Sequence, residues 1–260
     1  MRPLHRFFAA LLCCIVVTTT LGSDGFDPTI SPFSLPVGSV ILDAGHGGHD
    51  PGATSDYGEG EEFVIQEKDI VLDVMLRVTD LLTAWFPDIV VVTTRDDDRF
   101  ISLEDRAAIA AATNPGVGRS SLLVSIHANS TVGNGASGME LLIKQTDKQV
   151  RFLDPQVPDW AISRFANHTS GDLNRLLNRE NLLLASYIRQ SLVTRFPSVR
   201  FRGIKEQDVW VLNASRVPSI LIEIGFVSNQ EEALLMQDEG WKAEMAEAIA
   251  HGLANYINRD

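Results

Sequence analysis

Apolar residues recur along the chain with two different periods, which predict strands interleaved with helices. Short apolar runs of the kind found in buried strands lie at residues 40–42, 89–93, 122–126, 139–143, 209–212 and 220–224. Helical spacing of apolar residues predicts helices over residues 67–85, 103–112, 181–196 and 240–257. Strands that alternate with helices are typical of an α/β fold. We therefore expect a single domain with a mostly parallel, doubly wound sheet flanked by helices on both faces.

The start of the chain has the layout of a secretory signal peptide. Two arginines precede an apolar run over residues 7–17, and hydroxyl and small residues follow it. A membrane-spanning helix needs about 20 apolar residues, so we expect no stable membrane span after signal removal. The chain then divides into a signal peptide (1–22), a flexible lead-in (23–37) and a folded domain (38–260).

Composition and charge narrow the classes of partner. The 260 residues are 45% hydrophobic and carry 22 basic and 34 acidic side chains, for a net charge of -12. This balance excludes a disordered chain and disfavours nucleic acid and anionic lipid, which repel an acidic protein. Both cysteines, Cys13 and Cys14, lie in the predicted signal peptide. The exported protein then has no thiol, and its chemistry must come from histidines, carboxylates, hydroxyls or a metal ion.

Four polar residues stand at the ends of the predicted apolar segments or interrupt them. His46 and His127 each follow a strand-like run. Glu67 opens the first long helix, and Glu223 interrupts the apolar run at 220–224. A carboxylate among aliphatic residues is costly to bury unless it is paired, protonated or bound to a metal. Two histidines and one glutamate form the ligand set of a catalytic zinc site, and the remaining carboxylate is then available as general base and acid.

Each of these residues also has an ordinary structural interpretation. A histidine at a strand end is more often a hydrogen-bonded structural residue than a ligand, and Glu67 alone suits the first turn of a helix. Glu223 alone is compatible with a buried partner for an arginine. The glycines around His46 suit an anion-binding turn, although they lack the spacing and the lysine of a phosphate loop. Only the joint occurrence of the four residues on successive elements favours a catalytic site.

Five stretches, in one order, make the chain similar to a known family. They are Ile41–Ala53 (ILDAGHGGHDPGA), Glu67–Asp69 (EKD), Thr94–Arg95 followed by Leu103 and Arg106, Ser125–Asn129 (SIHAN) and Ile222–Asn229 (IEIGFVSN). They resemble the zinc-dependent N-acetylmuramoyl-L-alanine amidases of bacterial cell walls, of the amidase-3 type, from about Gly38 to the C-terminus. The resemblance implies a zinc hydrolase that cuts the amide between N-acetylmuramic acid and the L-alanine of the peptidoglycan stem peptide.

The same resemblance implies roles for the four residues. His46, Glu67 and His127 would bind one Zn²⁺ per chain, and Glu223 would be the catalytic carboxylate. The implied setting is cell-wall remodelling or daughter-cell separation in the periplasm or cell envelope, or outside the cell. Peptidoglycan is the expected substrate, an activator protein is a further candidate partner, and no nucleic acid is expected.

Two other functions stay open at this point. One is a catalytically inactive peptidoglycan-binding protein of the same fold, which the presence of all four residues disfavours. The other is a zinc hydrolase that cuts another amide of the wall, such as a peptidase or deacetylase. The metal chemistry would be the same, so only the identity of the products separates the second alternative from the amidase.

Other polar residues carry weaker predictions. Asp43 is a candidate to orient the loop or a ligand imidazole, with a capping or turn role as the alternative. His49 is expected at the rim of the site, whereas His168 and His251 are expected at the surface. A basic cluster is expected either to meet carboxylates of the stem peptide or to form a solvated face; it consists of Arg195, Arg200, Arg202 and Lys205.

The segment Lys144–Glu180 is longer than the connection of about 2–6 residues that such a fold needs. Its first half is predicted as a loop, and residues 159–178 as one or two short helices. Some members of the resembled family carry an inserted helix here that covers the zinc, so a lid or regulatory insertion is one expectation. The alternative is a surface helix that shapes the substrate groove. A lid needs an acid that reaches the metal, and the candidates are Asp159, Asp172 and Glu180.

Overall fold

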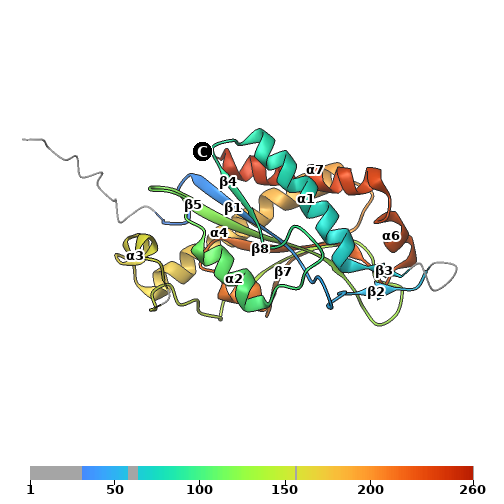
Figure 1. Ribbon diagram of the computed structural model, residues 1–260, viewed down its shortest axis with the longest axis horizontal. Coiled ribbons are helices and arrows are strands. Elements are labelled where there is room, and N and C mark those ends of the chain that lie inside the picture. Colours follow the sequence, from blue (N-terminus) through green and yellow to red (C-terminus); the bar gives the residue numbers. More distant parts are fainter. Residues whose placement is uncertain (1–30, 58–63, 156, 260) are drawn as a thin grey trace, which may run out of the picture.

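A six-stranded sheet forms the centre of the computed structural model, which describes residues 31–57, 64–155 and 157–259 (Figure 1). The predicted signal peptide, with Cys13 and Cys14, and the start of the lead-in lie outside these residues. The strand order is β4-β1-β5-β8-β6-β7. The strands are β1 (Val37–Ala44), β4 (Val90–Thr93), β5 (Ser120–Asn129), β6 (Met139–Lys144), β7 (Phe201–Gln207) and β8 (Ser219–Phe226). A separate antiparallel pair joins β2 (Thr54–Ser55) and β3 (Ile65–Gln66).

Helices cover both faces of the sheet, as the sequence predicts. They are α1 (Glu67–Trp85), α2 (Leu103–Ala112), α3 (Asp159–Phe165), α4 (Ser170–Arg195), α5 (Trp210–Ala214), α6 (Gln230–Leu235) and α7 (Glu239–Ile257). The long helices α1, α4 and α7 pack on one face and bury a large apolar cluster. The shorter α2 and α5 pack on the other face over a smaller cluster that includes Ile41, Leu123 and Leu221.

The sheet is mostly parallel, with one reversal that matters for the site. β4, β1, β5 and β8 are parallel neighbours, whereas β6 is antiparallel to β8 and parallel to β7. The carboxyl ends of β1, β5 and β8 therefore lie at the same end of the sheet as the amino end of β6. This single α/β domain with helices on both faces confirms the predicted fold class.

Most predicted elements are present, and two differ. The apolar run at 209–212 is not a strand: Val211 and Leu212 lie in α5 and bury their side chains against the smaller cluster. A short apolar run of this kind fits a five-residue helix as well as a buried strand, so the pattern alone does not decide between them. The helix predicted from residue 181 begins at Ser170, because the Thr169 hydroxyl accepts a hydrogen bond from the Asp172 N–H and caps it there.

The segment Lys144–Glu180 lies at the other end of the sheet from the candidate site. Because β6 is antiparallel to β8, β6 ends at Lys144 beside the amino ends of β8 and its neighbour β5. Arg164 of α3 donates a hydrogen bond to the carbonyl of Arg119, just before β5. About seven residues of β5, roughly 23 Å of strand, separate that end from His127.

The lid candidates have other contacts at this remote end. Glu180 is buried and accepts a hydrogen bond from the Tyr256 hydroxyl at 2.8 Å, and Asp172 helps to cap α4. Asp159 is exposed at the start of α3. The predicted loop and short helix are present, and the described residues of the segment lie at the amino ends of the strands, away from the ligand candidates. Its role as a lid or as part of the substrate groove stays a prediction. Within the described residues, no helix is both long and apolar enough to cross a membrane.

Candidate active site

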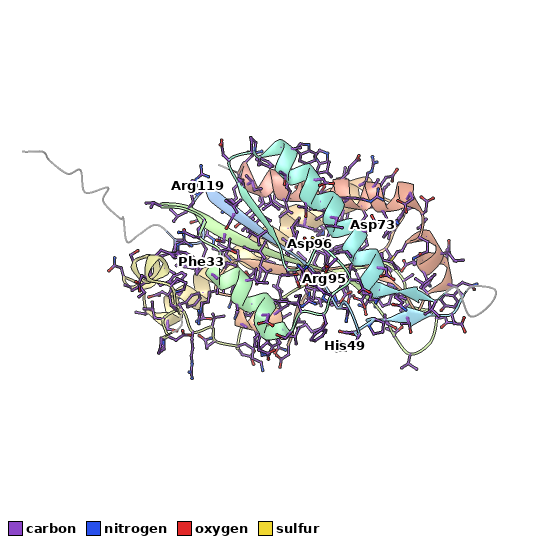
Figure 2. The ribbon with its side chains drawn as sticks, in the orientation of Figure 1. Phe33, His49, Asp73, Arg95, Asp96 and Arg119 are labelled. Atoms are coloured by element: carbon purple, nitrogen blue, oxygen red, sulfur yellow. The ribbon has the colours of Figure 1, made fainter. Side chains whose placement is uncertain are left out.

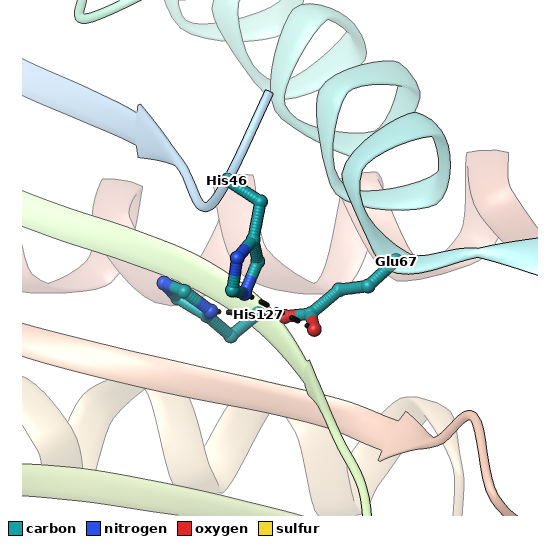
Figure 3. Close-up of side chains that lie close together, drawn as sticks. All are labelled: His46, Glu67 and His127. Atoms are coloured by element: carbon teal, nitrogen blue, oxygen red, sulfur yellow. Dashed lines mark hydrogen bonds and ion pairs between the residues drawn. The ribbon is translucent and has the colours of Figure 1, made fainter. Parts of the chain in front are cut away.

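Three side chains from three elements converge at the carboxyl end of the sheet. His46 from the loop after β1, Glu67 from the first residue of α1 and His127 from β5 each place a ligand atom within 4.8 Å of the others (Figure 3). Oε2 of Glu67 lies 3.1 Å from Nε2 of His46, and its Oε1 lies 2.9 Å from Nδ1 of His127. The N–H groups of Ala53 and Ala128 donate to the same two oxygens at 2.8 and 2.9 Å. The carboxylate is therefore held in one orientation.

The loop that carries His46 needs glycine neighbours. Among the described residues, His46 is the non-glycine residue with a positive φ, at 61°. A Cβ atom on Gly45 would lie 2.2 Å from the His127 ring, and one on Gly52 would lie 2.6 Å from Oε2 of Glu67. Such contacts are too short for any side chain, so both glycines make room for the three converging groups. Strained backbone of this kind is often found at functional sites.

Asp50, rather than Asp43, orients a candidate ligand imidazole. Oδ2 of Asp50 lies 2.8 Å from Nδ1 of His46, which directs Nε2 of the same ring toward Glu67. A carboxylate on the far nitrogen of a ligand histidine is a common way to fix its tautomer and orientation. Sequence reasoning missed Asp50, although its place four residues after His46 in the same glycine-rich loop was an available signal.

Asp43 belongs to a buried network beneath the loop. It accepts hydrogen bonds from Arg106 at 2.6 Å, from Thr94 at 2.7 Å and from Ser125 at 2.6 Å. Burial alone would raise the pKa of Asp43, but the Arg106 guanidinium and the two hydroxyls outweigh it and hold this pKa below its usual range. Arg106 also donates to the carbonyl of His46 at 2.6 Å. Asp43 thus supports the loop through Arg106, which matches the first of its predicted roles.

Arg95 ties the loop to the first helix. Its side chain is fully buried near the middle of the molecule (Figure 2). The guanidinium donates to the carbonyls of Gly45 and Lys68, both at 2.8 Å. Gly45 precedes His46 and Lys68 follows Glu67, so one side chain fixes the spacing between two candidate ligands. The sequence motif contained Arg95 and Arg106 but gave neither a role.

The electrostatics of the three side chains favour a cation. Burial alone would lower the pKa of His46, but Glu67 and Asp50 raise it to about 9. Burial alone would raise the pKa of Glu67, but His127 and His46 hold it far below its usual range. A buried carboxylate between two imidazoles is thus balanced by positive charge. Two nitrogens and a carboxylate oxygen are also the donor types that zinc prefers, so the residues fit a zinc ion.

Glu223 lies on β8 beside this group without belonging to it. It is in register with His127 of β5 on one side and with Glu140 of β6 on the other. Its Oε2 is buried and has no hydrogen-bond partner among the described residues. Burial raises the pKa of Glu223 to about 7; the nearby carboxylates of Glu67 and Glu140 act in the same direction and His127 opposes them. An unpartnered carboxyl with such a pKa can accept and release a proton near neutral pH.

The remaining candidates are dispersed. His49 stacks on Phe100, with ring centroids 4.3 Å apart, on the loop that carries His46. His251 stacks on Trp85 on the helical layer, away from the three convergent side chains. The predicted basic cluster is divided: Arg195 faces Glu244 and Glu247 on α7, whereas Arg202 and Lys205 contact Glu140 beside Glu223.

Comparison with known proteins assigns the family. Residues 40–255 match the family model Amidase_3, described as N-acetylmuramoyl-L-alanine amidase. The chain belongs to this family. The match covers most of the folded domain and confirms the resemblance seen in the five motifs, and with it peptidoglycan amide hydrolysis as the reaction.

Individual relatives agree with this assignment. The chain is 33% identical to Bacillus subtilis YqiI over 259 residues, which cover 100% of both chains. It is 32% identical to N-acetylmuramoyl-L-alanine amidase AmiC of Neisseria meningitidis, where 84% of this chain matches 52% of the relative, so the chain spans about half of AmiC. Among solved structures, an N-acetylmuramoyl-L-alanine amidase from Clostridium difficile 630 has a TM-score of 0.66 and 29% identity, covering 86% of this chain and 99% of the other. The CwlD amidase from Clostridioides difficile, in complex with the GerS lipoprotein, has a TM-score of 0.64 and 26% identity over 85% of this chain and 99% of the other.

Proposed function

We propose that this amidase is zinc-dependent, with His46, Glu67 and His127 as the metal ligands and Glu223 as the catalytic carboxylate. The observation that carries the proposal is the buried, unpartnered Oε2 of Glu223, in register with His127 and next to three ligand atoms within 4.8 Å of one another. Three protein ligands leave a coordination position for water, as catalytic zinc sites require.

The chemistry follows from the charges at the site. When bound, zinc supplies a Lewis acid that polarises the scissile carbonyl and acidifies water. The Glu223 carboxylate accepts a proton from the attacking water and donates it to the amine of L-alanine as that amine departs. Burial of Glu223 raises its pKa to about 7, in the range that suits both steps. Asp50, Arg95 and Arg106 hold the histidine loop in place and move no proton themselves.

We further propose that the enzyme acts outside the cytoplasm, in the periplasm or cell envelope. The layout of residues 1–22 supports this location, as does the nature of the substrate. An activator protein remains a proposal, supported by the complex of the CwlD amidase with a lipoprotein.

Digestion of purified sacculi tests the proposed function. We expect release of intact stem peptides with a free L-alanine amine, identified by mass, and loss of this release after treatment with a chelator. Restoration by added Zn²⁺ completes the test. Another cleaved bond would indicate a different wall hydrolase. Binding to sacculi without any cleavage would indicate an inactive wall-binding protein.

A further inference from the structure

Polar side chains form a row across one face of the sheet, beginning at the proposed metal site. His127 of β5 is in register with Glu223 of β8, and Glu223 is in register with Glu140 of β6. Residues in register on neighbouring strands point to the same face, so the three side chains lie side by side. This is the face that α2 and α5 cover only in part, opposite the layer of long helices.

The row continues onto the edge strand β7 as two cations. Arg202 Nε donates to Oε2 of Glu140 at 2.9 Å, and Lys205 Nζ donates to the same oxygen at 2.5 Å. The other oxygen of Glu140 accepts from the Asn129 amide at 2.9 Å. Glu140 is buried, whereas the side chains of Arg202 and Lys205 are 23% and 42% exposed. Two accessible cations thus share one buried carboxylate and leave an excess positive charge.

A bulge in β7 produces this arrangement. Residues three apart in a regular strand point to opposite faces, which would separate Arg202 from Lys205. Between the pairs Met139↔Phe201 and Leu141↔Ile204, β7 contains one residue more than β6. Gly203 lies in this stretch with a φ of +117°, a conformation that suits glycine. The extra residue turns both cations toward Glu140, in the way that bulges often redirect side chains beside active sites.

We propose that Arg202 and Lys205 form a carboxylate-binding subsite for the peptide part of the substrate; this inference rests on the proposed function. Neighbouring strands are about 4.8 Å apart, so β7 lies roughly 10 Å from Glu223 on β8. When the muramoyl lactyl group is in the scissile amide, the sugar side carries no free carboxylate. A carboxylate that reaches the two cations therefore belongs to the peptide, within the first residues beyond L-alanine.

The charges between the proposed metal site and β7 favour such a subsite. The chain has a net charge of -12, and Glu223 and Glu140 lie between the proposed metal site and the two cations. An anionic peptide would be repelled there without compensating cations. A charge-assisted hydrogen bond to a carboxylate contributes a factor of about 10 to 100 in affinity, which is enough to select acidic over amidated peptides.

The test compares one substrate with and without its carboxylates. Sacculi are first acetylated on their free amines, and half of the sample is then amidated with carbodiimide and ammonium. The rate at which free L-alanine amines appear is measured for both samples. We expect the wild-type enzyme to prefer the unamidated sample by about 10-fold or more. Lys205→Gln and Arg202→Gln should each reduce this ratio, and the double variant should bring it close to one.

Two further variants separate recognition from structure. Lys205→Arg keeps the charge and should keep the ratio. Lys148→Gln removes a comparable exposed lysine, paired with Asp208 at the other end of β7, and should leave the ratio at the wild-type value. A wild-type ratio near one, or a wild-type ratio retained by Lys205→Gln and the double variant, would overturn the subsite while leaving the amidase intact. Failure of the wild type to release L-alanine amines from either sample would instead overturn the proposed function.

If the preference is found, soluble dipeptides locate the carboxylate. The probes are N-acetylmuramoyl-L-alanyl-D-glutamate and its α- and γ-monoamides. The monoamide that loses the Lys205-dependent rate carries its amide at the carboxylate that the subsite binds. Equal rates for all three would restrict the subsite to carboxylates farther along the peptide.

Discussion

The two ends of the central sheet are held together by different interactions. At the carboxyl end, buried charges and backbone carbonyls are linked through Asp43, Arg95 and Arg106 to the loop that carries His46. At the amino end, the segment after β6 packs its own apolar cluster, in which Phe33 contacts Phe152 and Phe165. Figure 2 shows Phe33 near α3 and His49 toward the opposite end of the molecule.

The difference shows which end of the sheet requires exact side-chain positions. A metal site tolerates small errors poorly, and hydrogen bonds to fixed carbonyls define positions more sharply than apolar contacts do. The amino end of the sheet, called here the α3 end, has no such requirement: α3 and its neighbouring residues cover the amino ends of the strands and bury aromatic rings. We therefore expect substitutions at one end to affect metal binding and rate, and those at the other to affect stability alone.

The largest effect is expected from the proposed ligands. His46→Ala, Glu67→Ala and His127→Ala should each lower zinc content and abolish sacculus digestion, because two remaining ligands hold the metal weakly. His251→Ala, on the helical layer against Trp85, is the matched control and should keep both properties. Metal content by mass spectrometry checks this, and stoichiometric zinc with normal turnover in a ligand variant would show that the residue is misassigned.

Glu223→Gln separates binding from chemistry. The amide has the shape of the carboxylate but cannot accept the proton, so we expect the rate to fall by about 10²-fold or more with zinc retained. Glu231→Gln, an exposed acid on α6, should have the wild-type rate. Loss of zinc in Glu223→Gln would instead identify Glu223 as a ligand, and the roles of Glu67 and Glu223 would have to be exchanged.

Phe165→Ala tests the independence of the α3 end. The ring is 3% exposed and packs against Phe33 and Phe152, so its loss should reduce the free energy of unfolding by about 3–5 kcal/mol. Zinc affinity and the rate per folded molecule should remain unchanged, as measured on protein kept well below its unfolding midpoint. A rate change of several-fold would show that this end is coupled to the site after all.

A smaller effect is expected from the glycine that faces His127. In Gly45→Ala the new methyl group would lie 2.2 Å from the imidazole, so the ring must move. We expect zinc affinity to fall by about 10- to 100-fold. Gly171→Ala in α4 is the control, because its new methyl group meets only the Thr169 hydroxyl at 3.9 Å, and zinc affinity should not change. Competition with a chromogenic chelator gives both values.

The smallest effect is a change of stability with pH. The folded-state pKa of Asp43 lies below its ordinary value of 3.8, so its ionised form stabilises the fold above that pH, and the contribution is lost as pH falls through the folded-state pKa. Asp43→Asn lacks this contribution. In urea unfolding of the metal-free proteins, the difference in free energy of unfolding between wild type and variant should be largest near neutral pH and should decrease in acid. A gap independent of pH would contradict the role of the charge.

Much of the fold and of the candidate site follows from local sequence. The helix 67–85 has a clear helical period, and the runs 40–42, 122–126 and 220–224 have the apolar content of buried strands; the structure contains the expected element at each. His46, Glu67 and His127 each adjoin such an element, so their convergence followed from the alternation of strands and helices. The run at 209–212 has the same short apolar pattern but lies mostly in a helix, because a run of three or four residues does not define a period.

Three features depended on the tertiary structure. The direction of β6 decides that Lys144–Glu180 lies remote from the site, and strand direction leaves no mark on the apolar pattern of a buried strand. The β7 bulge decides that Arg202 and Lys205 face Glu140, because one extra residue in a strand reverses the alternation of side chains. Arg95 donates hydrogen bonds to the carbonyls of Gly45 and Lys68, which are far apart in the sequence, so no local pattern predicts this link. The sequence by itself thus determined which residues are the candidates for the chemistry, whereas strand direction, register and long-range hydrogen bonds decided what surrounds them.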